Sequence, residues 1–565
     1  MSHVQRTNIH RFFFSEEFLN NIDSNYYLKN NWPIVYLLSN SSTKKIYIGE
    51  TIDFYTRMTT HLKTFGKKEF NTLHVITSDQ FNKSATLDIE SYLIQYISAD
   101  RYWKLLNLNI GLSDHNYLEK SEKYWPIFET IWKGLKECGI TFNSLVYLNN
   151  SDLFKYSPFK SLNFEQKKGL IRIMDALLNN DVATVVAEGG AGTGKSIMAT
   201  YLFKLLMTDI EDFNYKYFGE HEPLFIALVR RLKKKYEHPK LAMVIPVTSF
   251  HATIKKLFKK IEGLNASMVI KPADLIHTHY DIIIVDEAHR LRRGRALGAY
   301  IGNFYRISRA LGFDPGRNTE LDWVQKRSKK SIIFYDKGQS VRASDVRKND
   351  FITLKSDPGT ETQRLEKQMR SQGGNKYIKF ATELLDCSLR TNSAKYSSSR
   401  FDLLLFDSVT KMRNEIRLRD KETGLSRMVA GYSWEWVSKN NPKLYDIRLE
   451  NQAYRWNKIT NDWINSGNAV NEIGCIHTTQ GYDLNYTGII FGREISYDRK
   501  KKEIIILKEY YYDKIGKIAD SDLEVKEYII NIYRTIMQRS IKGAYIYVFH
   551  PELKEYFSRY IQTSY

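Results

Sequence analysis

The stretch "VATVVAEGGAGTGKSIMATYLFKLLM", residues 182–207, decides the fold of most of the chain. A β-branched run of strand type leads into G-x-x-x-x-G-K-S, and a helical run follows. Backbone N–H groups of such a loop and the N-terminus of its helix converge on phosphates, so we predict a nucleotide site here. Its predicted residues are Gly189, Gly192, Gly194, Lys195 and Ser196, and the Ser196 hydroxyl is expected to hold Mg²⁺ as well.

A second motif supplies the carboxylates of such a site. Residues 282–289, "IIIVDEAH", have the composition of a buried strand that ends on Asp286 and Glu287. Acidic side chains at the carboxyl edge of a parallel sheet lie beside a phosphate loop on the neighbouring strand. We predict that Asp286 holds the metal and that Glu287 orients and deprotonates the attacking water.

Apolar runs alternate with helical stretches from about residue 160 onward. They occupy residues 182–190, 240–248, 280–288 and 331–339, and a second set occupies 400–408, 427–434, 486–494 and 543–550. Nearly continuous apolar runs are typical of strands buried on both faces of a parallel sheet. The pattern predicts the α/β class with two such domains in series, divided at the polar, turn-rich stretch around residues 350–360.

The order of the motifs resembles that of a superfamily-one helicase. "NFEQKKGL", the phosphate loop, "DEAH", "YDKGQ", "KQMRS", "CIHTTQGYDL" and "YRTIMQRSIKGAYIYV" follow one another between residues 163 and 548. More narrowly, "MVAGYSWEW" and "GCIHTTQGYDLNYTGIIFG" are similar to the Schlafen-like DNA/RNA helicase domain of prokaryotic proteins. The resemblance spans roughly residues 160–565 and implies two RecA-like doubly wound domains with ATP between them.

The resemblance also implies roles for individual residues. Gln166 would bind the adenine edge, and Gln339 would sense the γ-phosphate. Arg370 and Arg539 would bring guanidinium groups to the transition-state charge, although Gln538 stands where the family more often has threonine. The residues expected to couple nucleotide state to the bound strand are Gln480, Gly481 and Asp483.

A different resemblance lies near the N-terminus, in "IVYLLSNSSTKKIYIGETIDFYTRMTTHL", residues 34–62. Over about residues 32–112 the chain resembles the GIY-YIG nuclease domain, a small α+β fold with a short sheet flanked by helices. The matching positions are Ile34-Val35-Tyr36, Tyr47-Ile48-Gly49, Arg57, His61, Glu90 and Asn107. The sequence departs from the family at Ile34, where the first glycine normally stands.

This resemblance implies a hydrolytic site with one divalent metal. Glu90 would ligate Mg²⁺, for which Mn²⁺ can substitute. Tyr36 or Tyr47 would position or deprotonate the water, and Arg57 would stabilise negative charge. His61 would assist proton transfer or hold a phosphate. The alternative is that these tyrosines are packing residues in a domain that only binds nucleic acid.

The formal charge of +20 is concentrated outside the N-terminal part of the chain. Residues 1–150 hold 16 Lys/Arg and 15 Asp/Glu, whereas the other 415 residues hold 68 and 49. A basic excess of this kind favours a polyanionic partner, and we expect nucleic acid, DNA more than RNA. The candidate contact runs are residues 230–240, 255–261 and 289–295.

Other classes of protein fit the sequence poorly. No window of about 18 apolar residues is present, and no signal peptide is recognisable, so we expect no membrane partner and a cytoplasmic location. The three cysteines, Cys138, Cys387 and Cys475, are too far apart for a zinc knuckle and do not fit a disulfide framework. The sequence does not predict any protein partner.

Together the motifs predict five segments and one main function. The segments are an N-terminal extension (1–31), the nuclease-like domain (32–115), a helical linker (116–158) and two RecA-like domains (159–352 and 353–565). The predicted protein is an ATP-dependent nuclease-helicase that translocates on or unwinds nucleic acid and cleaves phosphodiesters, in antiviral defence or DNA repair. The alternatives are an ATP-gated sensor nuclease and a remodelling ATPase with a binding-only N-terminal domain.

Overall fold

The structure is a computed structural model that describes residues 7–20, 26–64, 69–107, 119–156, 162–208, 223–261, 263–459, 463–479, 481–519 and 521–564. It consists of two compact units. The first contains Met1–Lys167 and Thr208–Lys233, and the second contains Lys168–Met207 and Lys234–Tyr565.

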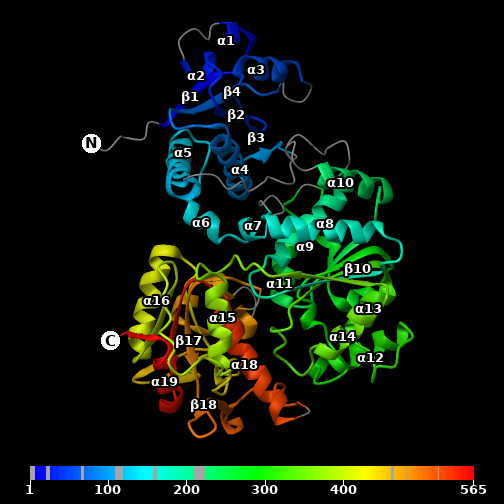
Figure 1. Cartoon of the computed structure of the whole chain (residues 1–565), viewed down its shortest axis with the longest axis vertical. Coiled ribbons are helices and arrows are strands. Elements are labelled where there is room, and N and C mark those ends of the chain that lie inside the picture. Colours follow the sequence, from blue (N-terminus) through cyan, green and yellow to red (C-terminus); the bar gives the residue numbers. More distant parts are fainter. Residues whose placement is uncertain are drawn as a thin grey trace. The chain divides into compact units, whose positions relative to one another are not determined.

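The first unit is built on a mostly antiparallel sheet with the strand order β1-β4-β2-β3-β5 (Figure 1). The strands are β1 (Thr7–Phe13), β2 (Ile34–Asn40), β3 (Lys45–Thr51), β4 (Thr72–Ser78) and β5 (Lys104–Leu105). Strands β2 and β3 form a hairpin in which Tyr36 stands opposite Gly49. Both faces of β2 are buried, because residues 34–39 are all inaccessible, so helices must cover the sheet on both sides.

Two helices provide that cover. On one face, α3 (Phe54–Lys63) packs Phe54 and Met58 against Tyr36 and Leu38. On the other face, the long helix α4 (Lys83–Asp100) contacts β2, β3 and β5. Helix α3 begins where the Asp53 side chain accepts the Thr56 N–H at 3.1 Å, and Asn82 caps α4 in the same way. The shorter helices α1 (Glu16–Asn20) and α2 (Tyr26–Lys29) pack on α3.

The segment predicted as a helical linker is also packed on this sheet. It contains α5 (Trp125–Glu137), α6 (Leu145–Asn150) and α7 (Asp152–Lys155). Helix α5 contacts β1, and its rings Phe128 and Trp132 lie within 5.6 Å of the Tyr96 ring of α4. The described residues of this segment therefore extend the core of the nuclease-like domain.

The second unit begins with a parallel sheet in the order β11-β6-β10-β9-β7-β8. Its strands are β6 (Thr184–Gly189), β7 (Leu241–Val244), β8 (Val269–Ile270), β9 (Tyr280–Val285), β10 (Ser328–Tyr335) and β11 (Thr360–Leu365). The helices that lie between or beside these strands along the chain are α8 (Phe164–Leu178), α9 (Lys195–Met207), α10 (Pro223–Lys235), α11 (Thr248–Phe258), α12 (Ile301–Ala310), α13 (Glu320–Arg327) and α14 (Lys348–Ser356). Helices α8 and α10 each run from the first unit into the second.

A second parallel sheet follows in the order β16-β13-β17-β20-β12-β21. Its strands are β12 (Asp402–Phe406), β13 (Arg427–Ala430), β16 (Ile473–Gly474), β17 (Leu484–Phe491), β20 (Ser540–Val548) and β21 (Gln562–Ser564). Its helices are α15 (Gly374–Leu385), α16 (Val409–Thr423), α17 (Ile476–Thr479), α18 (Asp522–Gln538) and α19 (Pro551–Ser558). Two small hairpins, β14 (Ile447–Leu449) with β15 (Gln452–Tyr454) and β18 (Ile495–Asp498) with β19 (Glu503–Ile506), stand outside the sheet.

The predicted fold class is confirmed, with a short mixed sheet followed by two RecA-like parallel sheets. Two strands lie on the other side of predicted boundaries. Strand β1 pairs with β4 inside the nuclease sheet, although residues 1–31 were expected to be an extension. Strand β11 pairs with β6, so the first parallel sheet extends beyond residue 352. Within the described residues, no helix is long and apolar enough to cross a membrane.

Candidate nuclease and ATPase sites

The hairpin of β2 and β3 brings Tyr36 into an unusually close approach to Gly49. A Cβ atom on Gly49 would lie 2.3 Å from the Tyr36 hydroxyl and 2.4 Å from its Cζ. Only glycine leaves room for this ring, which is completely buried. The glycine of the "YIG" triplet thus fixes where the Tyr36 hydroxyl lies.

That hydroxyl is held by two side chains of α3. His61 Nε2 lies 2.7 Å from it, and the Arg57 Nε donates to it at 3.1 Å. Because Arg57 can only donate, the hydroxyl proton is directed at His61, whose Nε2 must then accept. Arg57 also reaches the Tyr47 hydroxyl at 3.5 Å. Four of the predicted nuclease residues therefore form one hydrogen-bonded cluster.

Burial sets the protonation state of this cluster. Desolvation raises the pKa of Tyr36 well above its ordinary value, and Tyr47 and Glu90 add to the effect while Arg57 opposes it. Tyr36 is therefore a neutral phenol at physiological pH, able to accept one proton and pass on another. The electrostatic effect of Glu90 on Tyr36 also places the Glu90 carboxylate near the cluster.

The Glu90 carboxylate fits a site with one hard cation. It lies on α4 and is 1 % exposed. No group of three or more His, Cys, Asp and Glu side chains in the described part of the chain could hold a metal by itself. A single carboxylate completed by water and phosphate oxygens is a coordination that Mg²⁺ accepts.

Asn107 has a different place from the other predicted nuclease residues. Its Oδ1 accepts the Ile48 N–H at 2.9 Å, and its Nδ2 donates to the Ile48 carbonyl at 2.7 Å. The buried amide thus replaces a strand partner beside the centre of β3. These contacts are those of a residue that positions Tyr47 and Gly49 through the backbone between them.

In the second unit, the phosphate loop lies between β6 and α9 as the motif predicts. Lys195 Nζ donates to the carbonyls of Gly189 and Gly190 at 2.7 and 2.8 Å and lies 3.4 Å from Asp336 Oδ2. Gly192 has φ +77°, and a Cβ there would come within 2.8 Å of Arg370 Cβ. The glycine lets the "KQMRS" segment lie directly on the loop, and the Met369 N–H donates to the Gly192 carbonyl.

The acidic pair follows β9, which is separated from β6 by β10 in the sheet. Asp286 is fully buried, and desolvation together with Glu287 raises its pKa to about 6, while the Ser196 hydroxyl stabilises its carboxylate. Its Oδ2 accepts no hydrogen bond within the described residues, so this oxygen suits a divalent cation beside Ser196. Burial acts to raise the pKa of Glu287, but His289, Arg539 and Lys195 outweigh it and leave the carboxyl ionised.

Glu287 has a backbone conformation that few glutamates adopt. Its φ is +55°, in the left-handed region, and its Oε2 lies 2.9 Å from His289 Nε2. A non-glycine residue in this region costs about 1 kcal/mol or more and needs support from its surroundings. The contact to His289 orients the carboxylate at the end of β9.

A chain of buried hydrogen bonds joins the two parallel sheets. Gln339 Nε2 donates to Asp336 at 2.6 Å, and its Oε1 accepts from Arg539 Nη2 at 3.2 Å. Arg539, 2 % exposed, also donates to the Tyr482 carbonyl at 3.0 Å. Since Asp336 is the partner of Lys195, the chain connects the phosphate loop to the end of α18.

The other predicted motor residues lie around this chain. Arg370 Nε lies 2.6 Å from the Asp483 carboxylate, and Gly481 packs against the Phe250 side chain of α11. Gln166 exchanges hydrogen bonds with Asn163 at the start of α8, a reciprocal cap. Gln480 lies outside the described residues.

A basic cavity of about 280 Å³ lies at the N-terminus of α11, beside the motor residues. Its walls include Ser249, Arg290, Arg292, Arg342 and His477. Arg342 Nε donates to His477 Nε2 at 3.1 Å, and burial lowers the pKa of His477 far below its ordinary value, so this imidazole is neutral. A helix N-terminus and several guanidinium groups facing one cavity favour an anion.

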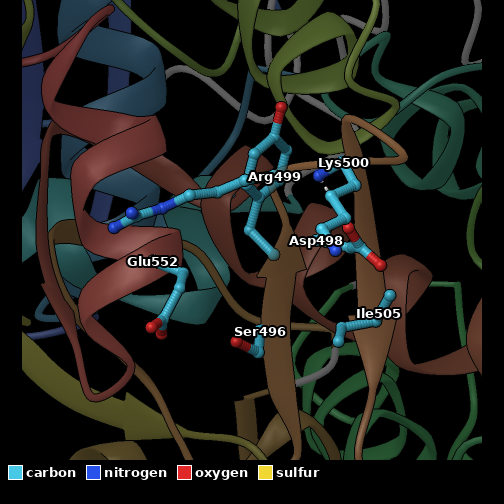
Figure 2. A pocket seen from close by; sticks show the side chains of 7 residues that line it. Ser496, Asp498, Arg499, Lys500, Ile505 and Glu552 are labelled. Atoms are coloured by element: carbon cyan, nitrogen blue, oxygen red, sulfur yellow. Dashed lines mark hydrogen bonds between the residues drawn. The ribbon is translucent and has the colours of Figure 1, made fainter.

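Arg342, His477 and the basic hairpin tip at 499–502 lie outside the basic runs that the sequence indicated as contact candidates, of which 289–295 contributes Arg290 and Arg292 to this cavity. Figure 2 shows the tip beside a shallow pocket of about 420 Å³ formed by β18, β19 and α19, with Arg499 and Lys500 extending to opposite sides. Arg499 Nη2 lies 2.5 Å from Glu555. The "DRKKKE" charge run at 498–503 was the available signal for this tip.

Two family models match the chain. The family model described as "Schlafen group 3, DNA/RNA helicase domain" matches residues 182–550, and the GIY-YIG catalytic domain model matches residues 33–104. A Saccharomyces cerevisiae protein described as uncharacterized protein YPL245W is 24% identical over 443 residues, covering 70% of this chain and 90% of its own length.

Two solved structures illustrate the wider similarity. Bacteroides sp. Pif1 in complex with ADP-AlF4 is 10% identical, with a TM-score of 0.30, and covers 70% of this chain and 94% of its own. Saccharomyces cerevisiae Dbp5 bound to RNA and ADP BeF3 is 12% identical, with a TM-score of 0.30, and covers 73% and 93%. The helicase model matches well over half of the present chain, so the chain belongs to the Schlafen group 3 DNA/RNA helicase family. It also carries a GIY-YIG nuclease domain, which precedes the helicase domain in the sequence.

Proposed function

We propose that this enzyme uses ATP to move on or unwind nucleic acid, DNA in preference to RNA, and cleaves phosphodiester bonds with its GIY-YIG domain. The observation that supports it most is the buried chain from Lys195 through Asp336 and Gln339 to Arg539. Such a chain lets a nucleotide on the phosphate loop act on the second parallel sheet, as a motor requires.

In the proposed nuclease reaction, Tyr36 or Tyr47 accepts a proton from the attacking water, and a proton accepted by Tyr36 is balanced by transfer of its own proton to His61 Nε2. The hydroxide attacks phosphorus as the bond to the leaving oxygen breaks, and Arg57 stabilises the negative charge that develops on the phosphate. Glu90 would hold one divalent ion, Mg²⁺ or Mn²⁺, which supplies Lewis acidity at the scissile phosphate. Asn107 acts by positioning β3.

In the proposed ATPase, Lys195 and the loop glycines bind the phosphates, and Ser196 with Asp286 would hold Mg²⁺. Glu287 orients and deprotonates the attacking water, since its low pKa leaves it ionised. Arg539 and Arg370 meet the transition-state charge, and Gln339 senses the γ-phosphate. We retain adenine binding by Gln166 and coupling to the strand by Gln480 and Gly481 as parts of the same proposal.

The proposal is tested by cleavage of labelled single-stranded, duplex and forked DNA and RNA, with and without ATP. We expect metal-dependent cleavage that disappears in Glu90→Gln, while this variant keeps its nucleic-acid-stimulated ATPase. Lys195→Ala should lose strand displacement and keep cleavage of short substrates. Equal cleavage by wild type and Glu90→Gln would exclude the nuclease assignment.

One alternative predicts a different result for the same variants. If nucleotide binding only gates the nuclease, the wild type shows no strand displacement, and Lys195→Ala keeps or gains cleavage of all substrates. A motor paired with a nuclease suits defence against foreign DNA or DNA repair, and we propose that setting on this pairing alone. Survival of cells lacking the gene after phage infection or DNA damage tests it.

A further inference from the structure

The first unit has an exposed group of aromatic rings at the β5 edge of its sheet, outside the hydrogen-bonded nuclease cluster. Tyr102 and Phe142 are 39 % and 41 % exposed, and Tyr147 is 62 % exposed. The Tyr102 and Phe142 ring centroids lie 4.0 Å apart with an angle of 34° between the planes. The two rings pack on one another, and each of the three rings keeps part of its surface exposed to solvent.

Positive charges surround these rings. Lys44 Nζ lies 5.1 Å from the Tyr102 ring centroid, in cation–π contact. Arg101 precedes Tyr102 and is close enough to Tyr147 for the two side chains to interact electrostatically. Exposed Lys104 follows on β5. We call the set Lys44, Arg101, Tyr102, Lys104, Phe142 and Tyr147 the aromatic–basic patch.

Buried and partly buried hydrogen bonds hold the backbone beneath the patch in place. The Asp100 carboxylate accepts hydrogen bonds from the backbone N–H groups of Phe142 and Asn143 at 2.7 and 2.9 Å, and these bonds stabilise its negative charge. The buried indole of Trp103 donates to the Ile140 carbonyl at 2.8 Å. Both contacts tie the Phe142 loop to the end of α4, and rings held in this way lose little entropy on binding.

The patch is also close to the nuclease cluster along one strand. Lys44 immediately precedes β3, and Lys104, the first residue of β5, pairs with Lys45, the first residue of β3. Tyr47 is three residues beyond Lys44, about 10 Å at the rise of a β-strand. A bound strand can therefore lie on the patch and reach the cluster within a few nucleotides.

We infer that the aromatic–basic patch binds single-stranded nucleic acid that flanks the cleavage point. Bases stack on the rings of Tyr102, Phe142 and Tyr147, and Lys44, Arg101 and Lys104 neutralise phosphates. Partly exposed aromatic rings beside cations suit unpaired nucleic acid, because every base can stack on a ring and every linkage carries a charge. The inference rests on the proposed nuclease function and adds its preference for an unpaired flank.

Ultraviolet crosslinking of the full chain tests the inference, with Glu90→Gln preventing cleavage. Probes are 20-nucleotide oligodeoxythymidine and oligouridine, and adducts are located by peptide mass spectrometry. We expect adducts on Tyr102 or Phe142. The inference would be overturned if all adducts lie in peptides of the helicase domain and the Tyr102→Ala, Phe142→Ala variant binds with unchanged affinity. It would also be overturned if another segment of the protein covers the patch and protects it from crosslinking.

Affinity measurements give a second, independent result. Fluorescence anisotropy should show that Tyr102→Ala with Phe142→Ala weakens oligonucleotide binding about fivefold or more, the lower end of the effect of losing base stacking. Tyr102→Trp, which keeps a π-face, should bind normally. Lys44→Asn removes the charge, suits the φ of +52° at this position, and should reduce the salt dependence of binding.

Phe13→Ala is the matched control, because Phe13 is 71 % exposed and lies on β1, the opposite edge of the same sheet. It should leave affinity within twofold. If the wild type cleaves nothing while the patch crosslinks, the nuclease proposal fails and this inference stands. If cleavage occurs but the patch variants cleave and bind normally with every flank, the inference fails alone.

Discussion

Replacing Gly49 by alanine should abolish cleavage through a steric clash with Tyr36. The new Cβ would stand 2.3 Å from the Tyr36 hydroxyl and 2.4 Å from Cζ, and the buried ring has no solvent to move into. Overpacking of this kind costs about 1–3 kcal/mol. Loss of the bonds to His61 and Arg57 adds about 1–3 kcal/mol, and the stiffer unfolded chain returns about 0.4–1 kcal/mol. We expect local destabilisation of about 1–6 kcal/mol.

The assay combines three measurements on the full chain. Hydrogen exchange of peptides covering residues 34–51 reports local stability, cleavage of a labelled fork reports the nuclease, and ATP turnover serves as the internal control and should be unchanged. A double-mutant cycle with Tyr36→Ala isolates the cause, because removing the ring removes the clash. In that background Gly49→Ala should cost at least about 1 kcal/mol less. Additive effects, or normal cleavage by the single variant, would refute the steric reasoning.

Three further predictions concern the helicase domain. Arg539→Ala should lower ATP hydrolysis about 10³-fold or more with little change in nucleotide affinity, measured by steady-state turnover and titration of a fluorescent analogue; a loss below tenfold contradicts an arginine-finger role. Burial raises the pKa of Glu494 from 4.5 to about 7, so the folded state binds the carboxyl proton more tightly than the unfolded state does. The free energy of unfolding should therefore fall by about 3 kcal/mol as the pH rises from 4.5 to 7. Glu494→Gln should flatten the dependence of Tm on pH across this window, and an unchanged slope speaks against it. If Arg342 in the basic cavity contacts one phosphate, Arg342→Ala should reduce the slope of log nucleic-acid affinity against log salt concentration by about 1. Lys421→Ala on α16 should leave this slope unchanged.

Residues that motif spacing grouped together lie together in the nuclease-like domain and at the phosphate loop, because the backbone of each motif brings them into contact. Tyr36 and Gly49 face one another in register, and Arg57 and His61 stand one helical turn apart. The identity of the hydrogen-bond partners was beyond the sequence. That Tyr36 binds both α3 side chains, and that Asn107 pairs with a strand backbone, depends on how the elements pack.

The strands that the sequence analysis placed outside their domains have a common physical reason. Strand β11, "TETQRL", lies at the edge of the first parallel sheet and is mostly exposed or half-buried. Strand β1 is also an edge strand, in which Asn8, Arg11 and Phe13 are exposed and the other residues are half-buried. A search for continuous apolar runs finds strands buried on both faces, and edge strands do not have that pattern.

The contacts of Lys195 indicate how a nucleotide could act on the second parallel sheet. Its ammonium group is shared between two loop carbonyls and Asp336, and a phosphate beside the loop would compete for the same charge. If the contact between Lys195 and Asp336 weakens, the Asp336 carboxylate keeps the hydrogen bond from Gln339 Nε2. The Oε1 of the same Gln339 side chain accepts a hydrogen bond from Arg539. All four side chains are less than 10 % exposed, and hydrogen bonds in such surroundings are electrostatically stronger than in water. Arg539 follows α18 directly and donates to the Tyr482 carbonyl, so three side-chain contacts connect the phosphate loop to the backbone beside the residues that we propose couple nucleotide state to the strand.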